Sequence, residues 1–323
     1  MPTGRRGDAL YSKSMGKQAG GWTPYTLPLM AEKAAREHFD ASAFYYENLP
    51  SDPTDAERVA SYAEAIHATA TLLDTAPMTW MDSDVCQLIA QSAETVPEWS
   101  PKAVMPGDSG LIAFGKPVAW LDAHRPDTPG ELIRDVPVDA IGWCTTNESR
   151  VVWVHIFTRD TRPRLLWTPN TPLTEIVRID LALDGIHDGA PVVDNNTDIP
   201  QSQAMHALST LAAVWLLMAQ PTVVDEGPAE KVHVRRRPAP RRHVTGRAQV
   251  TVSTRRLTTP PPSKQRGRTG RKVTTRWWVR GHWRQQAWGK NRALRKPVWI
   301  APHTAGHPDA DVDTRPHVQV WRE

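Results

Sequence analysis

Apolar residues recur every three or four positions in several stretches of the first two thirds of the chain, which predicts amphipathic helices. The clearest stretch covers residues 54–74, and Thr54 with Glu57 has the spacing of an N-terminal capping box. Further helices are expected at Leu27–Phe39, Ser83–Ala93 and Pro200–Gln220.

Short runs of β-branched and aromatic residues, separated by Pro, Gly, Asp and Asn, predict strands between the third and fourth of these helices. These runs are 110–114, 118–120, 138–143 and 151–158. The segment Glu175–Leu183 fits a strand or a helix, because its periodicity does not separate the two. We expect an antiparallel sheet with helices packed on it, and hence an α+β fold.

The composition changes after residue 220. Residues 221–272 are rich in Arg, Pro and Thr and poor in large apolar residues. A segment of that kind buries too little surface to offset its conformational entropy, so we predict a mostly disordered linker. Only Ala248–Ser253 within it has a β-like pattern. The predicted units are a flexible arm (1–25), an acidic α+β domain (26–220), a disordered basic linker (221–272) and a small basic, Trp-rich β unit (273–323).

The last unit is predicted to contain two strands, Arg276–Arg284 and Pro297–His303, with Trp288–Lys296 as a basic loop between them. His317–Arg322 is a plausible third strand.

Charge is distributed very unevenly along the chain. Residues 231–296 contain 21 Lys and Arg and no Asp or Glu, whereas residues 1–230 contain 16 Lys and Arg against 31 Asp and Glu. Such a split points to nucleic acid or to an anionic membrane surface. The longest apolar run, Leu211–Ala219, is far shorter than a membrane span, and Met1–Gly21 has no apolar core of a signal peptide. We therefore expect a cytoplasmic protein that binds no membrane.

The C-terminal unit alternates cations with aromatic side chains. Arg and Lys neutralise phosphates, and aromatic faces stack on unpaired bases, so this mixture is typical of a single-strand or RNA surface. If residues 276–284 form one strand, its cations share one face and Trp277 and Trp283 lie on the other. The residues expected to bind DNA or RNA are Arg276, Trp278, Arg280, His282, Arg284, Trp288, Arg292, Arg295 and Lys296.

Several alternatives stay open at this point. Trp277, Trp283 and Trp299 are candidates for the core of the small β unit, while Trp278 and Trp288 suit either a surface or a stacking role. The arginine stripe can be a solvated face, or a clamp onto the chain's own acidic domain. The acidic domain can contact a host protein or shield the basic arm.

Two other functions compete with simple nucleic-acid binding. His282 and His303 suit the base and acid of a metal-independent, toxin-like RNA-cleaving enzyme, with arginine steadying the charged transition state. Alternatively, the basic tail binds acidic host proteins.

No cofactor or metal is expected from the motifs. Cys86 and Cys144 form no CxxC pair, and the C-terminal histidines fit no common zinc spacing. The aspartates at 309, 311 and 313 lack the glycine and glutamate of an EF-hand. Asp139, His155 and Asp160 look like scattered polar residues among strands, with His155 as a satisfied core or edge histidine, so the N-terminal domain offers no catalytic constellation.

The C-terminal pattern RGHWR at 280–284, followed by WIAPH at 299–303, resembles a segment of uncharacterised proteins of actinobacteria, their phages and mobile elements. The central GLIAF and KPV runs are similar to the same proteins. This resemblance implies a phage or mobile-element source and brings no established activity. The hypothesis is a non-enzymatic nucleic-acid-binding protein of that type.

Overall fold

The computed structural model describes fourteen segments of the chain. They are residues 22–97, 99–124, 132–145, 151–159, 173–183, 192–193, 200–220, 223–227, 229–233, 249–258, 275–279, 281–300, 303–305 and 311–312.

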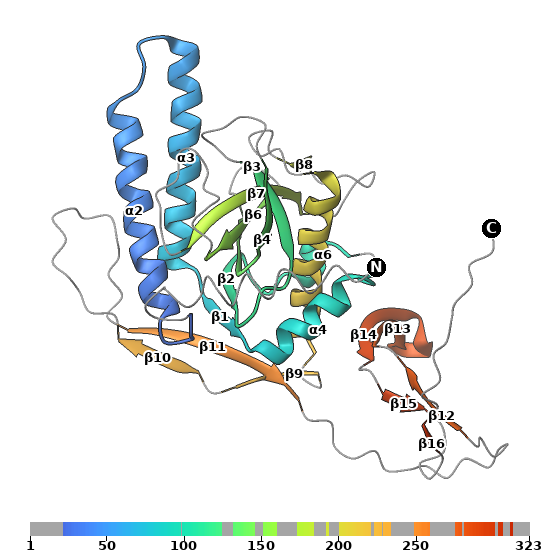
Figure 1. The fold of residues 1–323 in the computed structure, drawn as a ribbon. Coiled ribbons are helices and arrows are strands. Elements are labelled where there is room, and N and C mark those ends of the chain that lie inside the picture. The colour runs from blue at the N-terminus through green and yellow to red at the C-terminus, as the bar shows by residue number, and fades with distance from the viewer. Residues whose placement is uncertain are drawn as a thin grey trace.

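A nine-stranded sheet forms the centre of the molecule (Figure 1). Its order is β10-β11-β1-β2-β5-β6-β7-β8, and β9 pairs with β11. The strands are β1 (Met78–Met81), β2 (Ser109–Phe114), β5 (Ala140–Thr145), β6 (Val151–Thr158), β7 (Thr174–Ala182), β8 (Val192–Val193), β9 (Val224–Glu226), β10 (Glu230–His233) and β11 (Gln249–Leu257). The pairings are antiparallel except those of β1, which runs parallel to β2 and β11. The predicted α+β class is confirmed, and the sheet is mixed.

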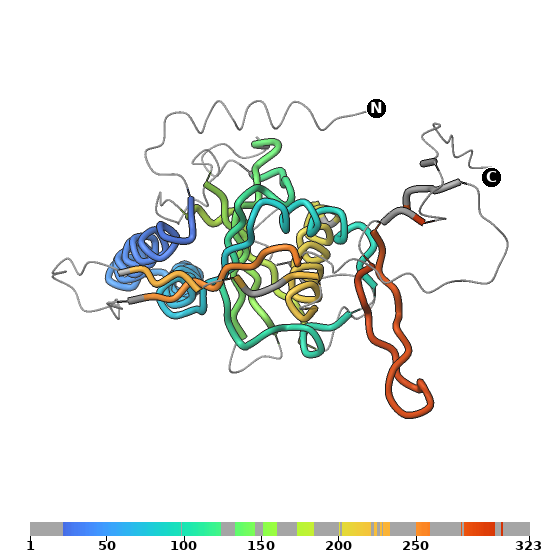
Figure 2. Tube along the Cα trace, turned by 90° about the horizontal axis from the view of Figure 1, so that it is seen from below, coloured from blue at the N-terminus to red at the C-terminus, as the bar shows by residue number. Residues whose placement is uncertain are grey.

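Helices cover both faces of this sheet (Figures 1 and 2). Helices α2 (Leu27–Glu47) and α3 (Pro53–Thr75) form an antiparallel pair on one face. Helices α4 (Ser83–Ala93) and α6 (Gln201–Met218) lie on the other, with the short α5 (Pro101–Val104) near α6. The segment between β1 and β2 contains α4 and α5. Because β1 and β2 are parallel, their connection has to pass over one face of the sheet, and these two helices form that crossover.

The sheet has a hydrophobic core on each face, because the side chains of each strand alternate between the two faces. In β2, Leu111 and Ala113 join the apolar cluster under α2 and α3, whereas Ile112 and Phe114 join the cluster under α4 and α6. Successive side chains of a strand point to opposite faces, so a central strand with helices on both sides is apolar throughout. None of the helices in the described residues is long and apolar enough to cross a membrane.

Most predicted helices and strands are present, with shifted ends. The predicted helix at 27–39 extends to Glu47, and the ambiguous segment at 175–183 is strand β7. The capping box at Thr54 and Glu57 was wrong. Asp52 is the N-cap, and its Oδ1 accepts hydrogen bonds from the backbone N–H groups of Thr54 and Asp55 at 3.0 and 3.1 Å. Proline at 53 suits the first helical position, so the helix starts one residue earlier than predicted.

The predicted disordered linker was wrong for the segments that form β9 and β10, whereas the β-like run at Ala248–Ser253 coincides from Gln249 onward with strand β11, which extends to Leu257. Strand β11 lies beside β1 in the main sheet, and Val250, Val252 and Thr254 are buried there. Composition misled the prediction because the exposed positions of this strand carry Thr and Arg while only alternate positions are apolar. Nε of Arg256, in the same strand, lies 2.9 Å from Oδ2 of Asp82, so this arginine forms an ion pair with the acidic domain.

The last part of the chain forms small sheets. Strand β12 (Thr275–Val279) pairs with β15 (His303–Ala305) and with β16 (Asp311–Val312), whereas β13 (His282–Trp288) and β14 (Leu294–Ile300) form a separate hairpin. A further pair, β3 (Trp120–His124) and β4 (Leu132–Pro137), lies near α6. The predicted single strand at 276–284 was therefore wrong, because it divides into β12 and β13 around Gly281. The predicted third strand at 317–322 and the arm at 1–21 lie outside the described residues.

Candidate nucleic-acid interface

The β13–β14 hairpin carries six of the nine residues predicted to bind nucleic acid. Its register runs from His282 opposite Ile300 to Trp288 opposite Leu294. The predicted basic loop is shorter than expected, because pairing continues to Leu294 and leaves only residues 289–293 to turn.

The turn itself adopts left-handed backbone conformations. Gly289 has φ 78°, and Asn291 and Arg292 in the short helix η3 (Lys290–Arg292) have φ 55° and 56°. Glycine accepts such angles without steric cost, and asparagine tolerates them better than most residues. The turn therefore presents the cations at 290 and 292 at the end of the hairpin, where both side chains are exposed.

The base of the hairpin is docked on the main domain. Trp299 is 2% exposed and belongs to the same core as α4 and α6, and Trp283 packs against that core. The indole N–H of Trp283 donates to the Ser92 carbonyl at 3.1 Å, and the backbone N–H of Trp299 donates to Oε1 of Gln220 at 2.8 Å. The two rings meet edge to face at 5.2 Å. Trp299 is thus a core residue and Trp283 packs beside it, but the core is that of the main domain and not the separate core of the small β unit that was predicted.

The opposite side of the hairpin, which we call the open face, follows from the register and the alternation of side chains. It consists of His282, Arg284, Gln286, Trp288, Leu294, Lys296, Val298 and Ile300. Trp288 is 48% exposed and Leu294 is 52% exposed, and they face each other across the strands. The ammonium of Lys296 lies 5.7 Å from the centre of the Trp288 ring.

The cations of the hairpin make no ion pair with a carboxylate among the described residues. Arg284 donates instead to the amide oxygen of Gln286. Arg295, on the other face, donates to the Arg292 carbonyl at 2.9 Å. Unlike Arg256, the cations of the hairpin therefore form no ion pair with the described acidic groups of the main domain.

The remaining predicted residues are not brought together with the hairpin by any described contact. Arg276 and Trp278 lie on β12, whose side chains at these positions are outside the described residues, as is all of Arg280. His303 lies on β15, and its side chain is not described either. The RNA-cleaving pair of His282 and His303 therefore stays a prediction.

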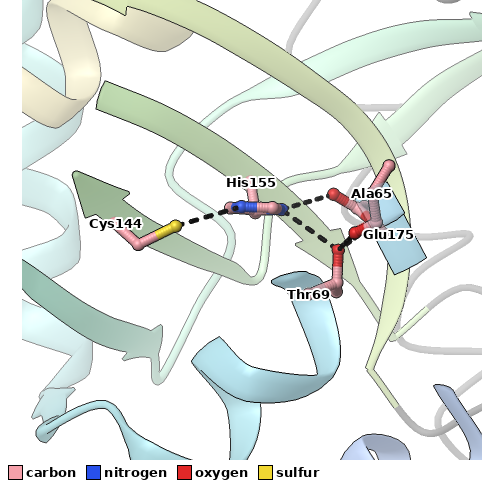
Figure 3. Close-up of polar contacts among 5 residues, drawn as sticks. All are labelled: Ala65, Thr69, Cys144, His155 and Glu175. Atoms are coloured by element: carbon pink, nitrogen blue, oxygen red, sulfur yellow. Dashed lines mark hydrogen bonds and ion pairs between the residues drawn. The ribbon is translucent and has the colours of Figure 1, made fainter. Parts of the chain in front are cut away.

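A second polar group lies inside the main domain (Figure 3). His155 on β6 is completely buried, and its Nδ1 lies 2.7 Å from Oε1 of Glu175 on β7. Its Nε2 lies 3.8 Å from Sγ of Cys144 on β5. The Thr69 hydroxyl on α3 is 3.1 Å from the second carboxylate oxygen of Glu175. His155 was correctly predicted as a satisfied core histidine, but its contacts with Glu175 and Cys144 were not predicted.

The surroundings of His155 favour its charged form. Burial opposes protonation, but the Glu175 carboxylate and hydrogen bonds to Cys144 and Glu175 outweigh it and raise the pKa of His155 to about 9. Burial likewise disfavours the Glu175 carboxylate, and His155 and then Arg178 and His38 reverse that effect and lower its pKa. The two residues form a buried ion pair.

Asp139 has a separate buried partner. Its carboxylate accepts from the backbone N–H of Arg159 at 2.9 Å and pairs with the guanidinium of the same residue, which also lies 4.9 Å from the ring centre of Trp22. This arrangement fixes the chain after β6 and explains a polar residue at a fully buried position. Asp160 is outside the described residues. No group of three or more His, Cys, Asp and Glu within the described segments is placed to hold a metal ion.

Comparisons with known proteins add little to this geometry. No protein-family model matches the chain, and no curated protein matches it. Among solved structures, the chain is similar to one titled "Crystal structure of AcrVA2", with 9% sequence identity and a TM-score of 0.37. The match covers 84% of this chain and 94% of that chain. The agreement is too low to transfer a function.

Two features of these sites had no usable signal in the sequence. Cys144, His155 and Glu175 lie 11 and 20 residues apart on three successive apolar strands, so only strand pairing brings them together. The docking of Trp283 and Trp299 onto α4 and α6 was equally invisible, because each tryptophan fits a small independent core as well as a shared one.

Proposed function

We propose that this protein binds nucleic acid without cleaving it, and that the open face of the β13–β14 hairpin is its contact surface. The observation that carries the proposal is an exposed indole, Trp288, among cations that have no described carboxylate partner. These cations are Arg284 and Lys296 on the open face and Lys290 and Arg292 in the turn, whereas Arg295 lies on the other face of the hairpin.

Phosphate contact supplies the affinity in this proposal. Each cation that neutralises a phosphate releases condensed counterions, so the binding constant falls with salt by a slope of ~0.7 per contact on a single strand. The turn and the open face place these side chains along one arm, and Figure 2 shows this arm extending from the body of the molecule. Because residues 1–230 carry a strong excess of acids, repulsion favours approach of a polyanion from the hairpin side.

Stacking supplies the preference for unpaired bases. Base stacking on an aromatic side chain is worth ~1–3 kcal/mol by alanine substitution. Trp288 has the exposure for it, and the facing Leu294 extends the apolar surface. Lys296 lies beside the ring and is placed to reach a phosphate next to a stacked base. A duplex hides its bases from such a contact, so the proposal predicts tighter binding to single strands.

The source and the wider role are part of the same proposal. The resemblance of residues 280–284 and 299–303 to actinobacterial phage and mobile-element proteins supports an origin of that type. The acidic helix pair α2–α3 is then the surface proposed for a host protein.

The test measures anisotropy of labelled single- and double-stranded DNA and RNA with the full chain over a salt series. Lys296→Gln is expected to reduce the salt slope by about one phosphate contact. The matched control is Arg58→Gln, which removes an exposed cation from α3 and is expected to leave the slope unchanged. Absence of binding at low salt, or equal loss in both variants, overturns the proposal.

A second pair of variants tests stacking. Trp288→Ala is expected to weaken single-strand binding ~5–150-fold, which corresponds to ~1–3 kcal/mol. Trp120→Ala removes a tryptophan of similar exposure, 41%, from β3 and is expected to have no effect. Denaturing gels of the same RNA samples should show intact RNA. Cleavage that disappears in His282→Ala would instead support the enzymatic alternative.

A further inference from the structure

Three neighbouring strands place a thiol, an imidazole and a carboxylate in a row. Cys144 on β5 lies diagonally across from His155 on β6, because Gly142 is the direct partner of His155. Glu175 follows on β7 next to a register shift of the β6–β7 pairing. Figure 3 shows the imidazole between the sulfur on one side and the Thr69 and Glu175 oxygens on the other.

The orientation of the imidazole is specific. Its Nδ1 is bound by the carboxylate at 2.7 Å, and its Nε2 points to the sulfur at 3.8 Å. This is the order in which a carboxylate, an imidazole and a nucleophile are arranged in nucleophilic catalysis. Because His155 holds its proton beside the Glu175 carboxylate, loss of the Sγ proton to water leaves a thiolate that faces an imidazolium, and Glu175 balances the charge of that imidazolium.

The other titratable and polar groups around the pair come from three elements. His38 on α2 and Arg178 on β7 both lower the pKa of Glu175, although burial lowers the pKa of His38 itself and so favours its neutral form. Arg178 also lies 4.7 Å from the ring centre of Trp153. The Thr69 hydroxyl donates to the Glu175 carboxylate from the α3 side. Glu175 is thus held by Thr69 as well as by His155, which fixes the orientation of the imidazole.

The two cysteines of the chain differ in access and in surroundings. Cys144 is partly exposed and packs against the edge of the core under α2 and α3. Cys86 is buried, its thiol donates to the Met81 carbonyl, and burial raises its pKa to about 11. Because His155 is completely buried, a reagent can approach this group only from the Cys144 side, and we expect that reagent to be small.

We infer that Cys144 is a nucleophilic thiolate that accepts small activated acyl groups, with the His155 imidazolium as its partner and proton donor and Glu175 as the residue that positions His155. In the reaction, the Sγ thiolate attacks the acyl carbon of an ester or thioester. The bond from that carbon to the leaving oxygen or sulfur breaks, and the leaving group takes the proton from Nε2 of His155. The product is an S-acyl cysteine. Neutral His155 then takes a proton from the water that hydrolyses the thioester, which releases the acid and restores the thiolate and the imidazolium.

The first experiment uses iodoacetamide as a probe of thiol nucleophilicity, with peptide mass spectrometry of the full chain. Native Cys144 should be alkylated at pH 6 at least about tenfold faster than the same cysteine in urea, because an ordinary thiol is less than ~1% ionised there. Native Cys86 should be slower than its urea-denatured form. A native Cys144 rate equal to or below its rate in urea overturns the inference.

The second experiment uses 4-nitrophenyl acetate and detects the acetyl adduct by mass. The Cys86→Ser variant should still carry one acetyl group, on Cys144, and Cys144→Ser should carry none. Thr69→Val, which leaves all three reacting groups in place, should lower the Cys144 rate and shift its pH profile towards that of an ordinary thiol. Acetylation that does not need Cys144, or a pH profile unchanged in both Thr69→Val and Glu175→Gln, overturns the assigned roles.

Discussion

Replacing Trp299 with alanine tests whether the C-terminal hairpin is part of the main domain. The side chain is 2% exposed in a core that it shares with α4 and α6. Removing ~200 Å² of buried aromatic surface at ~25 cal/mol per Å² corresponds to about 5 kcal/mol, of which the alanine Cβ retains a small part. Measured Trp→Ala costs in cores agree, at ~3–5 kcal/mol.

The same substitution also removes the edge-to-face contact with Trp283 at 5.2 Å. The backbone hydrogen bond to Gln220 survives in the variant, since it uses the N–H of residue 299. We therefore expect the free energy of unfolding of Trp299→Ala to fall by about 3–4 kcal/mol. Trp288→Ala, in the same hairpin but half exposed, should cost less than ~1 kcal/mol.

Urea unfolding followed by far-ultraviolet circular dichroism is the assay, because that signal comes mainly from α2, α3 and α6. If Trp299→Ala lowers the free energy of unfolding measured from this helical signal, the hairpin and the main domain unfold together. If Trp299→Ala unfolds within about 0.5 kcal/mol of the unaltered chain, as Trp288→Ala should, the hairpin is an independent unit and the docking argument fails.

Three further predictions concern the main domain. In Gly142→Ala the added Cβ would lie 2.6 Å from Cδ2 of Leu72, so overpacking should cost ~1–3 kcal/mol, and Leu72→Ala in the same chain should recover part of it. Because the folded pKa of His155 is raised to about 9, its contribution to stability is full below ~6.5 and is lost as the pH rises through 9. The unaltered chain should therefore lose more stability between pH 6.5 and 9.5 than His155→Gln does. Val252→Asp, a fully buried position of β11, should cost more than ~3 kcal/mol, whereas Thr251→Asp beside it should be tolerated.

Each of these three predictions has one result that would contradict it. Equal urea midpoints for Gly142→Ala and the unaltered chain would mean that α3 lies farther from β5 than the structure has it. Parallel pH curves for the unaltered chain and His155→Gln would mean that the buried ion pair does not form. Equal tolerance of aspartate at 251 and 252 would mean that β11 does not pack into the main sheet.

Much of the local structure follows from the sequence because local patterns report local environments. A helix such as α4 shows its buried face at a period of 3.6 residues, and β6 shows its hydrophobic character in eight consecutive residues. The charge split between residues 1–230 and 231–296 was equally plain. From the sequence alone, His282 and Arg284 could be placed on one strand face and Trp283 on the other, and the structure confirms that arrangement.

Only the tertiary structure decided which segments meet. The β-like run at 248–253 stands out within a basic, proline-rich segment, but its sequence did not show that it joins the main sheet. Strand β11 does so because β1 offers it an unpaired backbone edge and a place to bury alternate valines. The same holds for Cys144, His155 and Glu175, which three separate strands bring into one row. Strand pairing depends on contacts between residues that are distant along the chain. No local pattern of hydrophobicity or charge encodes those contacts, so the individual helices and strands could be predicted while their arrangement could not.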